Sequence, residues 1–248
     1  MLKKRIIISL TFVDGILHRT KNFKPDYRYT KNFIDLWSID ELVIIDISGK
    51  KFKKEFLKVV EFFSTNCFVP LTVGGGISSL SDADIYFKYG ADKILLGPNS
   101  IFTPQVAKEI SMKYGKQSII QSLDCKLDKY NIKKYNVFGY SGIKNLNQNP
   151  ILLGNQALKN GIGEILINSI DNDGSLLGYD INLIKEVSKN LNCPIIALGG
   201  AGNWGHIAEL FHKTDISGAC TQNIFHFTEQ SIKSAKNFLK INGIKIRK

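Results

Sequence analysis

Two apolar runs of the chain end in related pentapeptides, ISLTF at Ile8–Phe12 and QSLDC at Gln121–Cys125. The second contains Asp124, and a carboxylate that loops shield at the end of a buried strand can have its pKa tuned for proton transfer. At the matching position the first has Thr11, whose hydroxyl hydrogen-bonds but does not act as an acid or base near neutral pH. We therefore predict Asp124 as the general acid or base, with a helix or loop cap as its alternative role.

Further carboxylates follow two other apolar runs. Asp173, in SIDNDG, is the next acid/base candidate, whereas its neighbour Asp171 fits a turn or cap. Asp46, in IIDIS, has the pattern of a buried residue, and we expect it to support the structure.

Two glycine clusters also follow apolar runs, VGGGI at residues 73–77 and LGGAG at residues 198–202. Glycines let backbone N–H groups approach a ligand closely, as phosphate binding requires. Because the clusters lie in equivalent positions, they indicate a ligand with a phosphate at each end.

Eight short β-rich runs must position these residues, and helical patterns separate them. Near-continuous apolar runs are typical of strands buried on both faces of a parallel sheet. Eight β-then-α units in 248 residues predict a single closed (β/α)8 TIM barrel, with an open doubly wound sheet as the weaker alternative. Active sites of such barrels lie at the C-terminal ends of the strands, which places the residues above at one mouth. The expected strands are 5–12, 42–47, 69–74, 93–97, 118–124, 164–170, 194–199 and 217–221, and the expected helices are 29–37, 51–64, 80–89, 104–114, 151–160, 181–191, 204–213 and 228–241.

The chain also matches itself. The stretch from LTVGGGI to NSIF resembles the stretch from IIALGGAG to NIFHF, and ELVI at Glu41 resembles EILI at Glu164. We interpret this as two half-barrels, about 1–115 and 116–248, with a longer segment after the first strand of the first half. A β-hairpin is expected over 126–142, above the active site.

Four strands begin with a charge placed directly before apolar residues. These are Arg5, Glu41, Lys93 and Glu164. Two positive and two negative groups could neutralise one another in a ring that plugs or gates the barrel floor. The other interpretation is that they are exposed charges at strand starts.

Composition narrows the class of function. The net charge of +11 admits nucleic acid, an acidic partner or a phosphorylated substrate, but the lysines are dispersed and no nucleic-acid motif occurs. No apolar run is long enough for a membrane helix, and the four cysteines form no CxxC pair. We expect a cytoplasmic protein without metal, cofactor, membrane contact or nucleic-acid partner.

The motifs KRIIISL, DELVIIDI, LTVGGGI, GADKI, QSLDCK, FGYSG, GIGEILINSIDNDG, PIIALGGAG and NIFHF together resemble the cyclase subunit of imidazole glycerol phosphate synthase almost end to end. The resemblance implies a duplicated half-barrel with two phosphate sites. It also implies a heterodimer with a glutaminase subunit, whose ammonia passes up the barrel and reacts with a ribulosyl-phosphate intermediate to yield imidazole glycerol phosphate and AICAR. By position, Asp124 matches a catalytic aspartate and Asp92 a glutaminase-docking residue. The charged gate matches Arg5, Glu41, Lys93 and Glu164, and the phosphate sites match Gly76, Asp173, Gly174, Gly200 and Asn223.

Two departures from the family pattern fall in the first half. Thr11 replaces the second catalytic aspartate, and Gly97-Pro98 replaces an Asn-Thr pair, although Asn99 or Ser100 could substitute at that phosphate site. Arg19 replaces a lysine and keeps the charge.

We therefore favour a paralogue of the surface-glycan type, in which the barrel delivers ammonia to a third enzyme, an amidotransferase that forms an acetamidino sugar. The alternatives are a true histidine-pathway cyclase in which Asp124 suffices, and a non-catalytic scaffold with a basic surface.

Overall fold

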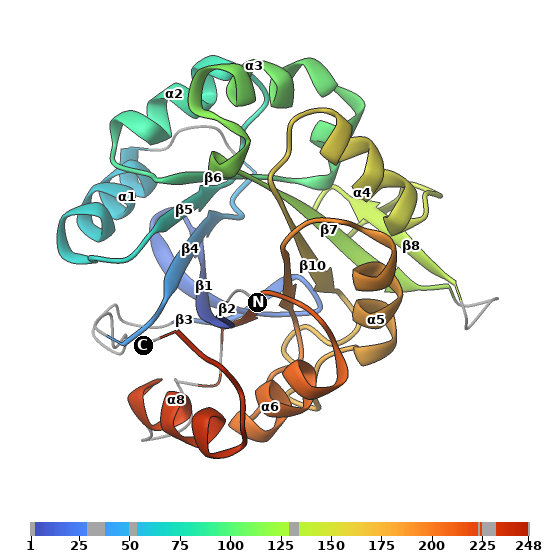
Figure 1. Ribbon diagram of the computed structural model, residues 1–248. Helices are drawn as coiled ribbons and strands as arrows, with labels where there is room; N and C mark the ends of the chain where they lie inside the picture. The colour runs from blue at the N-terminus through green and yellow to red at the C-terminus, as the bar shows by residue number, and fades with distance from the viewer. Residues whose placement is uncertain are drawn as a thin grey trace.

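The computed structural model describes residues 3–28, 38–49, 54–128, 134–222, 224 and 232–247. Eight strands pair in parallel and close on themselves, because the last strand pairs with the first and the fifth pairs with the sixth (Figure 1). The prediction of a (β/α)8 barrel is therefore confirmed. In order around the barrel these strands are β1 (Arg5–Val13), β4 (Glu41–Asp46), β5 (Leu71–Gly74), β6 (Lys93–Leu96), β7 (Ile119–Leu127), β10 (Glu164–Ser169), β11 (Ile195–Leu198) and β12 (Gly218–Thr221).

Helices surround the barrel on its outside (Figure 1). The helix expected at 29–37 lies outside the described residues, and the helix expected at 228–241 is described from Ile232. The helices are α1 (Lys54–Asn66), α2 (Leu80–Lys88), α3 (Pro104–Tyr114), α4 (Pro150–Lys159), α5 (Ile181–Asn190), α6 (Trp204–Lys213) and α8 (Ile232–Ile241), with short 3-10 turns η2 (Pro98–Phe102) and η3 (Lys116–Ser118). No helix in these described ranges is long and apolar enough to cross a membrane.

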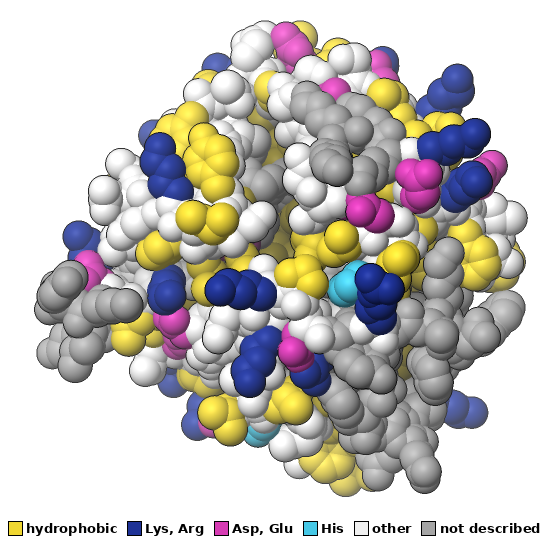
Figure 2. Space-filling view, turned by 180° about the vertical axis from the view of Figure 1, so that it is seen from behind, with side chains coloured by type: hydrophobic (Ala, Val, Ile, Leu, Met, Phe, Trp, Pro, Cys, Tyr) yellow, Lys and Arg dark blue, Asp and Glu magenta, His cyan; other side chains and the backbone are white. Residues whose placement is uncertain are grey.

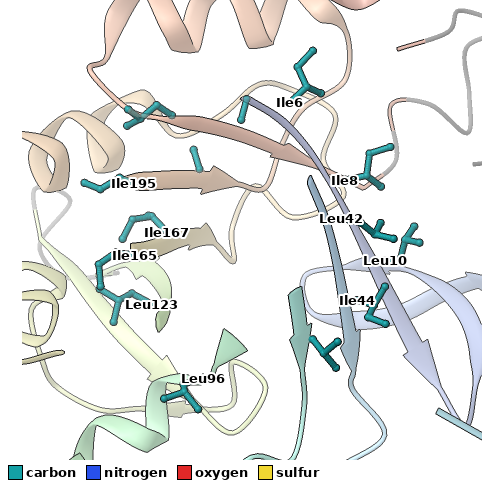
Figure 3. Close-up of a cluster of buried hydrophobic side chains, with 14 of the residues drawn as sticks. Ile6, Ile8, Leu10, Leu42, Ile44, Leu96, Leu123, Ile165, Ile167 and Ile195 are labelled. Carbon is teal, nitrogen blue, oxygen red and sulfur yellow. The ribbon is translucent and has the colours of Figure 1, made fainter. Parts of the chain in front are cut away.

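Side chains of the strands alternate between two hydrophobic environments. On β1, Ile6, Ile8 and Leu10 belong to the large cluster between strands and helices, as do Ile165 and Ile167 on β10 (Figure 3). The residues between them point into the barrel. There they form a separate inner cluster of Ile7, Val43, Leu95, Ile120, Leu166, Ile196, Leu198 and Cys220. Burial on both faces explains why the sequence shows continuous apolar runs.

Two antiparallel hairpins extend the barrel beyond its mouth. The first continues β1 into β2 (Ile16–Lys21) and β3 (Lys24–Arg28), and it accounts for part of the longer first-half segment. The second continues β7 into β8 (Tyr135–Gly139) and β9 (Lys144–Asn145), so the paired strands of the hairpin expected over 126–142 are present, while its residues 129–133 lie outside the described residues. Each half thus has a hairpin after its first barrel strand. The duplication and its boundary stay a prediction.

Short polar caps fix where the helices behind the mouth begin. The side chain of Asp180 accepts a hydrogen bond from the Leu183 N–H at the start of α5, and Asn203 does the same for His206 in α6. An N-cap of this kind satisfies an N–H group that the helix itself leaves unpaired. These caps end the loops that follow β10 and β11, and both loops contribute to the site.

Candidate functional site

Asp124 lies at the mouth end of β7 with only 9% of its surface exposed. Its Oδ1 accepts a hydrogen bond of 2.7 Å from Ser122 Oγ, two residues earlier on the same face of the strand. Burial raises the pKa of Asp124 to about 7, although hydrogen bonds from Ser122 and Asn168 oppose part of that rise. The nearby charge of Asp173 raises this pKa further. A carboxyl group with this pKa can both donate and accept a proton near neutral pH.

The raised pKa makes the stability of the fold depend on pH. The folded state holds the Asp124 proton more tightly than the unfolded state, so its contribution is lost as pH rises from about 4 to about 7. As pH rises through this window, the unmodified chain loses this contribution and Asp124→Asn does not. We therefore expect the unfolding free energy of Asp124→Asn to increase by roughly 4 kcal/mol relative to that of the unmodified chain. Urea unfolding at several pH values measures the difference. The exposed Asp215→Asn is the control, and a difference for Asp124→Asn that does not change with pH would contradict the assignment.

Thr11 lies near the end of β1, and its hydroxyl bonds within the protein. The hydroxyl donates to the backbone oxygen of His18 at 2.7 Å and accepts from Gln222 Nε2 at 2.6 Å. Thr11 is 8% exposed. The residue that the sequence repeat aligns with Asp124 is therefore a buried hydroxyl that is bonded within the protein and is neither an acid nor a base.

The candidates of the second-half phosphate site line one pocket at the mouth. Asp173, Gly174 and Gly200 lie there with Gly199 and Gln222. Gly174 and Gly200 have positive φ angles of 69° and 98°, and a Cβ on Gly200 would lie 2.0 Å from the Gly178 oxygen. Glycine is therefore required at both positions. Asn223, the remaining candidate, lies outside the described residues.

The first-half phosphate candidates each make local contacts. Arg19 forms an ion pair with Asp26 on the neighbouring strand β3. The side-chain oxygen of Asn99 packs so closely on Gly139 that a Cβ there would lie 2.1 Å from it. Gly76 is exposed with a φ of 68°. We assign these three residues to no common pocket.

The four charges at the strand starts form a closed charge ring at the barrel floor. Arg5 Nη1 lies 2.7 Å from Glu41, and Arg5 Nη2 pairs with Glu164. Lys93 Nζ completes the ring at 3.3 Å from Glu41 and 3.4 Å from Glu164. Burial alone would lower the pKa of Arg5, but its bonds and charge contacts with the two glutamates outweigh this and raise that pKa. Arg5, Glu41 and Glu164 are buried, so the interpretation as exposed charges is wrong.

The other predicted carboxylates each accept a hydrogen bond from a backbone N–H group. Asp92 is exposed at the floor, beside the ring residue Lys93, and its Oδ2 accepts from the Leu71 N–H at 2.8 Å. Asp46 Oδ1 accepts from the Ser48 N–H at 2.9 Å, as in a turn. Asp171 accepts from the Leu127 N–H and lies 3.8 Å from Lys126.

Figure 2 shows the face of the molecule that points away from the viewer in Figure 1. On this face, hydrophobic, lysine and arginine side chains surround a central hollow.

Four residues of the site had no role assigned from the sequence: Thr20, Ser122, Asn168 and Gln222. Ser122 was recognisable, since it precedes Asp124 by two residues and shares its face of the strand. Thr20, Asn168 and Gln222 come close to the site only once the chain has folded.

Comparison with known proteins agrees with this architecture. Residues 12–231 match the family described as histidine biosynthesis protein. The chain is 34%, 35% and 37% identical to the imidazole glycerol phosphate synthase subunits HisF of Streptococcus mutans, Bacillus subtilis and Prosthecochloris aestuarii, and each match covers the whole of both chains. With the closed barrel and its buried charge ring, these matches show that the chain belongs to the HisF family of imidazole glycerol phosphate synthase cyclase subunits.

Proposed function

We propose that this barrel receives ammonia at its floor from a glutaminase subunit and uses it at its mouth. The main support for this proposal is the closed ring of four charges. Its ion pairs block the lumen, but they can separate to open it. When the closest approach of each ion pair is compared, Lys93 makes the longest pairs of the ring, and its side chain is 18% exposed against 10%, 4% and 9% for Arg5, Glu41 and Glu164. It is therefore the member that can swing aside at the lowest cost.

The lumen above the ring suits a neutral molecule. The inner cluster defined above is apolar and its residues are at most 9% exposed. An ammonium ion would lose its hydration shell there at a high cost, whereas uncharged ammonia would not. Asp92 lies exposed at the floor beside Lys93, where we place the contact with the glutaminase.

At the mouth we assign proton transfer to Asp124 and binding of a phosphorylated acceptor to the pocket of Asp173, Gly174 and Gly200. The relatives are named as imidazole glycerol phosphate synthase subunits. We therefore propose the ribulosyl-phosphate intermediate of that synthase as the acceptor, with imidazole glycerol phosphate and AICAR as products. Asp124 can serve alternately as base and acid, because its pKa lies at about 7.

Thr11 favours a second candidate function. A barrel with one of its two acid/base positions filled by an internally bonded hydroxyl could deliver ammonia to a third enzyme, such as an amidotransferase that forms an acetamidino sugar. In that case ammonia still enters through the charge ring at the floor, but no reaction is catalysed at the mouth of this barrel.

One assay separates the two functions. The purified chain is incubated with the ribulosyl-phosphate intermediate and a high concentration of ammonium salt, which removes the need for a glutaminase. We expect formation of imidazole glycerol phosphate, increasing with pH as ammonium loses its proton. Absence of product, with intact folding by circular dichroism, would contradict the cyclase function and favour ammonia delivery.

A further inference from the structure

Gln222, just beyond the end of β12, joins three parts of the mouth. Its Nε2 lies 2.6 Å from Thr11 Oγ1 and 3.0 Å from the backbone oxygen of His18. Its Oε1 accepts from Thr20 Oγ1 at 3.0 Å. Thr20 in turn lies 3.2 Å from Asp173 Oδ1. The side chain therefore connects β1, the β2–β3 hairpin and the loop after β10.

The proton positions in this network follow from its atoms. A carbonyl oxygen only accepts, so the amide nitrogen of Gln222 must face His18 and its oxygen must face Thr20. Thr11 then uses its one proton on His18 and accepts from Gln222, which leaves its hydroxyl without a proton to donate to a ligand.

The Thr20 hydroxyl has one proton and two acceptors within reach, Gln222 Oε1 at 3.0 Å and Asp173 Oδ1 at 3.2 Å. The hydroxyl donates to one of these two oxygens at a time, so Thr20 links Gln222 and Asp173 through one shared proton. Burial raises the pKa of Asp173, although hydrogen bonds from the Phe23 N–H and the Thr20 hydroxyl oppose part of the rise. The other oxygen, Oδ2, accepts from the Phe23 N–H at 2.9 Å.

We infer that Gln222 is a positioning residue. Its amide occupies the acceptor site of the Thr11 hydroxyl and, through Thr20, fastens the β2–β3 hairpin to Asp173 across the mouth. Thr11 is then part of this fastening and has no catalytic role. Asp173 and Gln222 also line the second-half pocket, so these contacts border the place where a phosphate group would bind. The contacts themselves are independent of the proposed function, and only their effect on turnover depends on it.

Hydrogen exchange of the backbone amides tests the inference without any catalysis. Gln222→Leu roughly keeps the volume and removes every hydrogen bond of the amide, and Thr20→Val removes the hydroxyl contacts with Gln222 and Asp173. We expect exchange over residues 16–28 to rise about tenfold in Gln222→Leu, since the net loss of one or two hydrogen bonds is worth about that factor. Thr20→Val, which preserves strand propensity, should change in the same direction.

A double variant and a control make the result specific. If Gln222 acts through Thr11, Thr11→Val with Gln222→Leu exchanges within about twofold of Gln222→Leu alone, as expected for residues in one network. Ser175→Ala, on the neighbouring loop after β10, should leave residues 16–28 unchanged. Exchange within twofold of the unmodified chain in both Gln222→Leu and Thr20→Val would overturn the inference, as would additive effects in the double variant.

The hydrogen bond between Gln222 and Thr11 also affects a variant that places an acid at position 11. A carboxylate in Thr11→Asp would meet the Gln222 amide and the His18 oxygen, so the amide would hold it in place and the carbonyl would repel it. We expect Thr11→Asp with Gln222→Ala to exceed Thr11→Asp alone by about tenfold in the ammonium-dependent assay, and equal rates would count against the coupling. If every variant is silent in that assay, the proposed cyclase function fails, while the exchange result still decides the role of Gln222.

Discussion

Asp124→Asn is expected to slow ammonium-dependent turnover by roughly 10²–10⁴-fold, which is the usual contribution of a positioned acid or base. The amide keeps the shape of the side chain and can still bond to Ser122, but it cannot exchange a proton near neutral pH. Because Thr11 is held by His18 and Gln222, it offers no proton in place of the lost one. The measurement is the rate of imidazole glycerol phosphate formation under saturating substrate.

The pH profile and a matched variant make this result specific. The unmodified chain should show a change of slope near pH 7, where Asp124 titrates, and Asp124→Asn should lose it. Asp171→Asn replaces a nearby carboxylate that bonds to the Leu127 N–H, and it should keep most of the rate. A fall of less than tenfold in Asp124→Asn would exclude Asp124 as the principal acid or base.

Arg5→Ala is expected to lower the free energy of unfolding by about 3–5 kcal/mol, because removing one partner of a buried charge network leaves the others uncompensated. Arg5 contacts both Glu41 and Glu164, which lie at 3% and 7% exposure. Without Arg5, the half-buried Lys93 and the more distant Arg247, 3.8 Å from Glu41, must balance two buried carboxylates. Chemical denaturation of the isolated chain measures the loss.

Two further variants separate charge from packing in the ring. Adding Glu164→Gln to Arg5→Ala should recover part of the stability, since it removes one of the stranded charges. Lys213→Ala, which breaks an exposed pair with Glu209, should cost less than about 1 kcal/mol. If Arg5→Ala costs no more than this control, the ring does not hold the floor of the barrel together.

Residues at the strand ends were predictable because the barrel itself was predictable. Runs such as RIIISL and EILINS are apolar on both faces, as a strand between helices and an inner cluster requires. Once eight such strands are arranged in parallel, their first residues share the floor and their last residues share the mouth. Arg5, Glu41, Lys93 and Glu164 could therefore be grouped before any coordinates, and so could Asp124 and Asp173.

Two predictions made from the sequence are not tested by the comparisons with known proteins. The matches support the HisF family and the cyclase subunit of the synthase, whereas the paralogue of the surface-glycan type remains a proposal that depends on Thr11. The boundary between half-barrels at about residue 115 also stays a prediction.

By itself, the sequence determined the closed barrel, the two ends of its strands and the carboxylate of Asp124, because hydrophobic period and strand order repeat along the chain. Only the tertiary structure decided that Arg19 pairs with Asp26, that the β2–β3 hairpin extends from β1, and that Gln222 saturates Thr11. The last contact joins residues 211 positions apart. Side-chain hydrogen bonds of this kind follow no period, since they depend on where two loops meet after the barrel has closed.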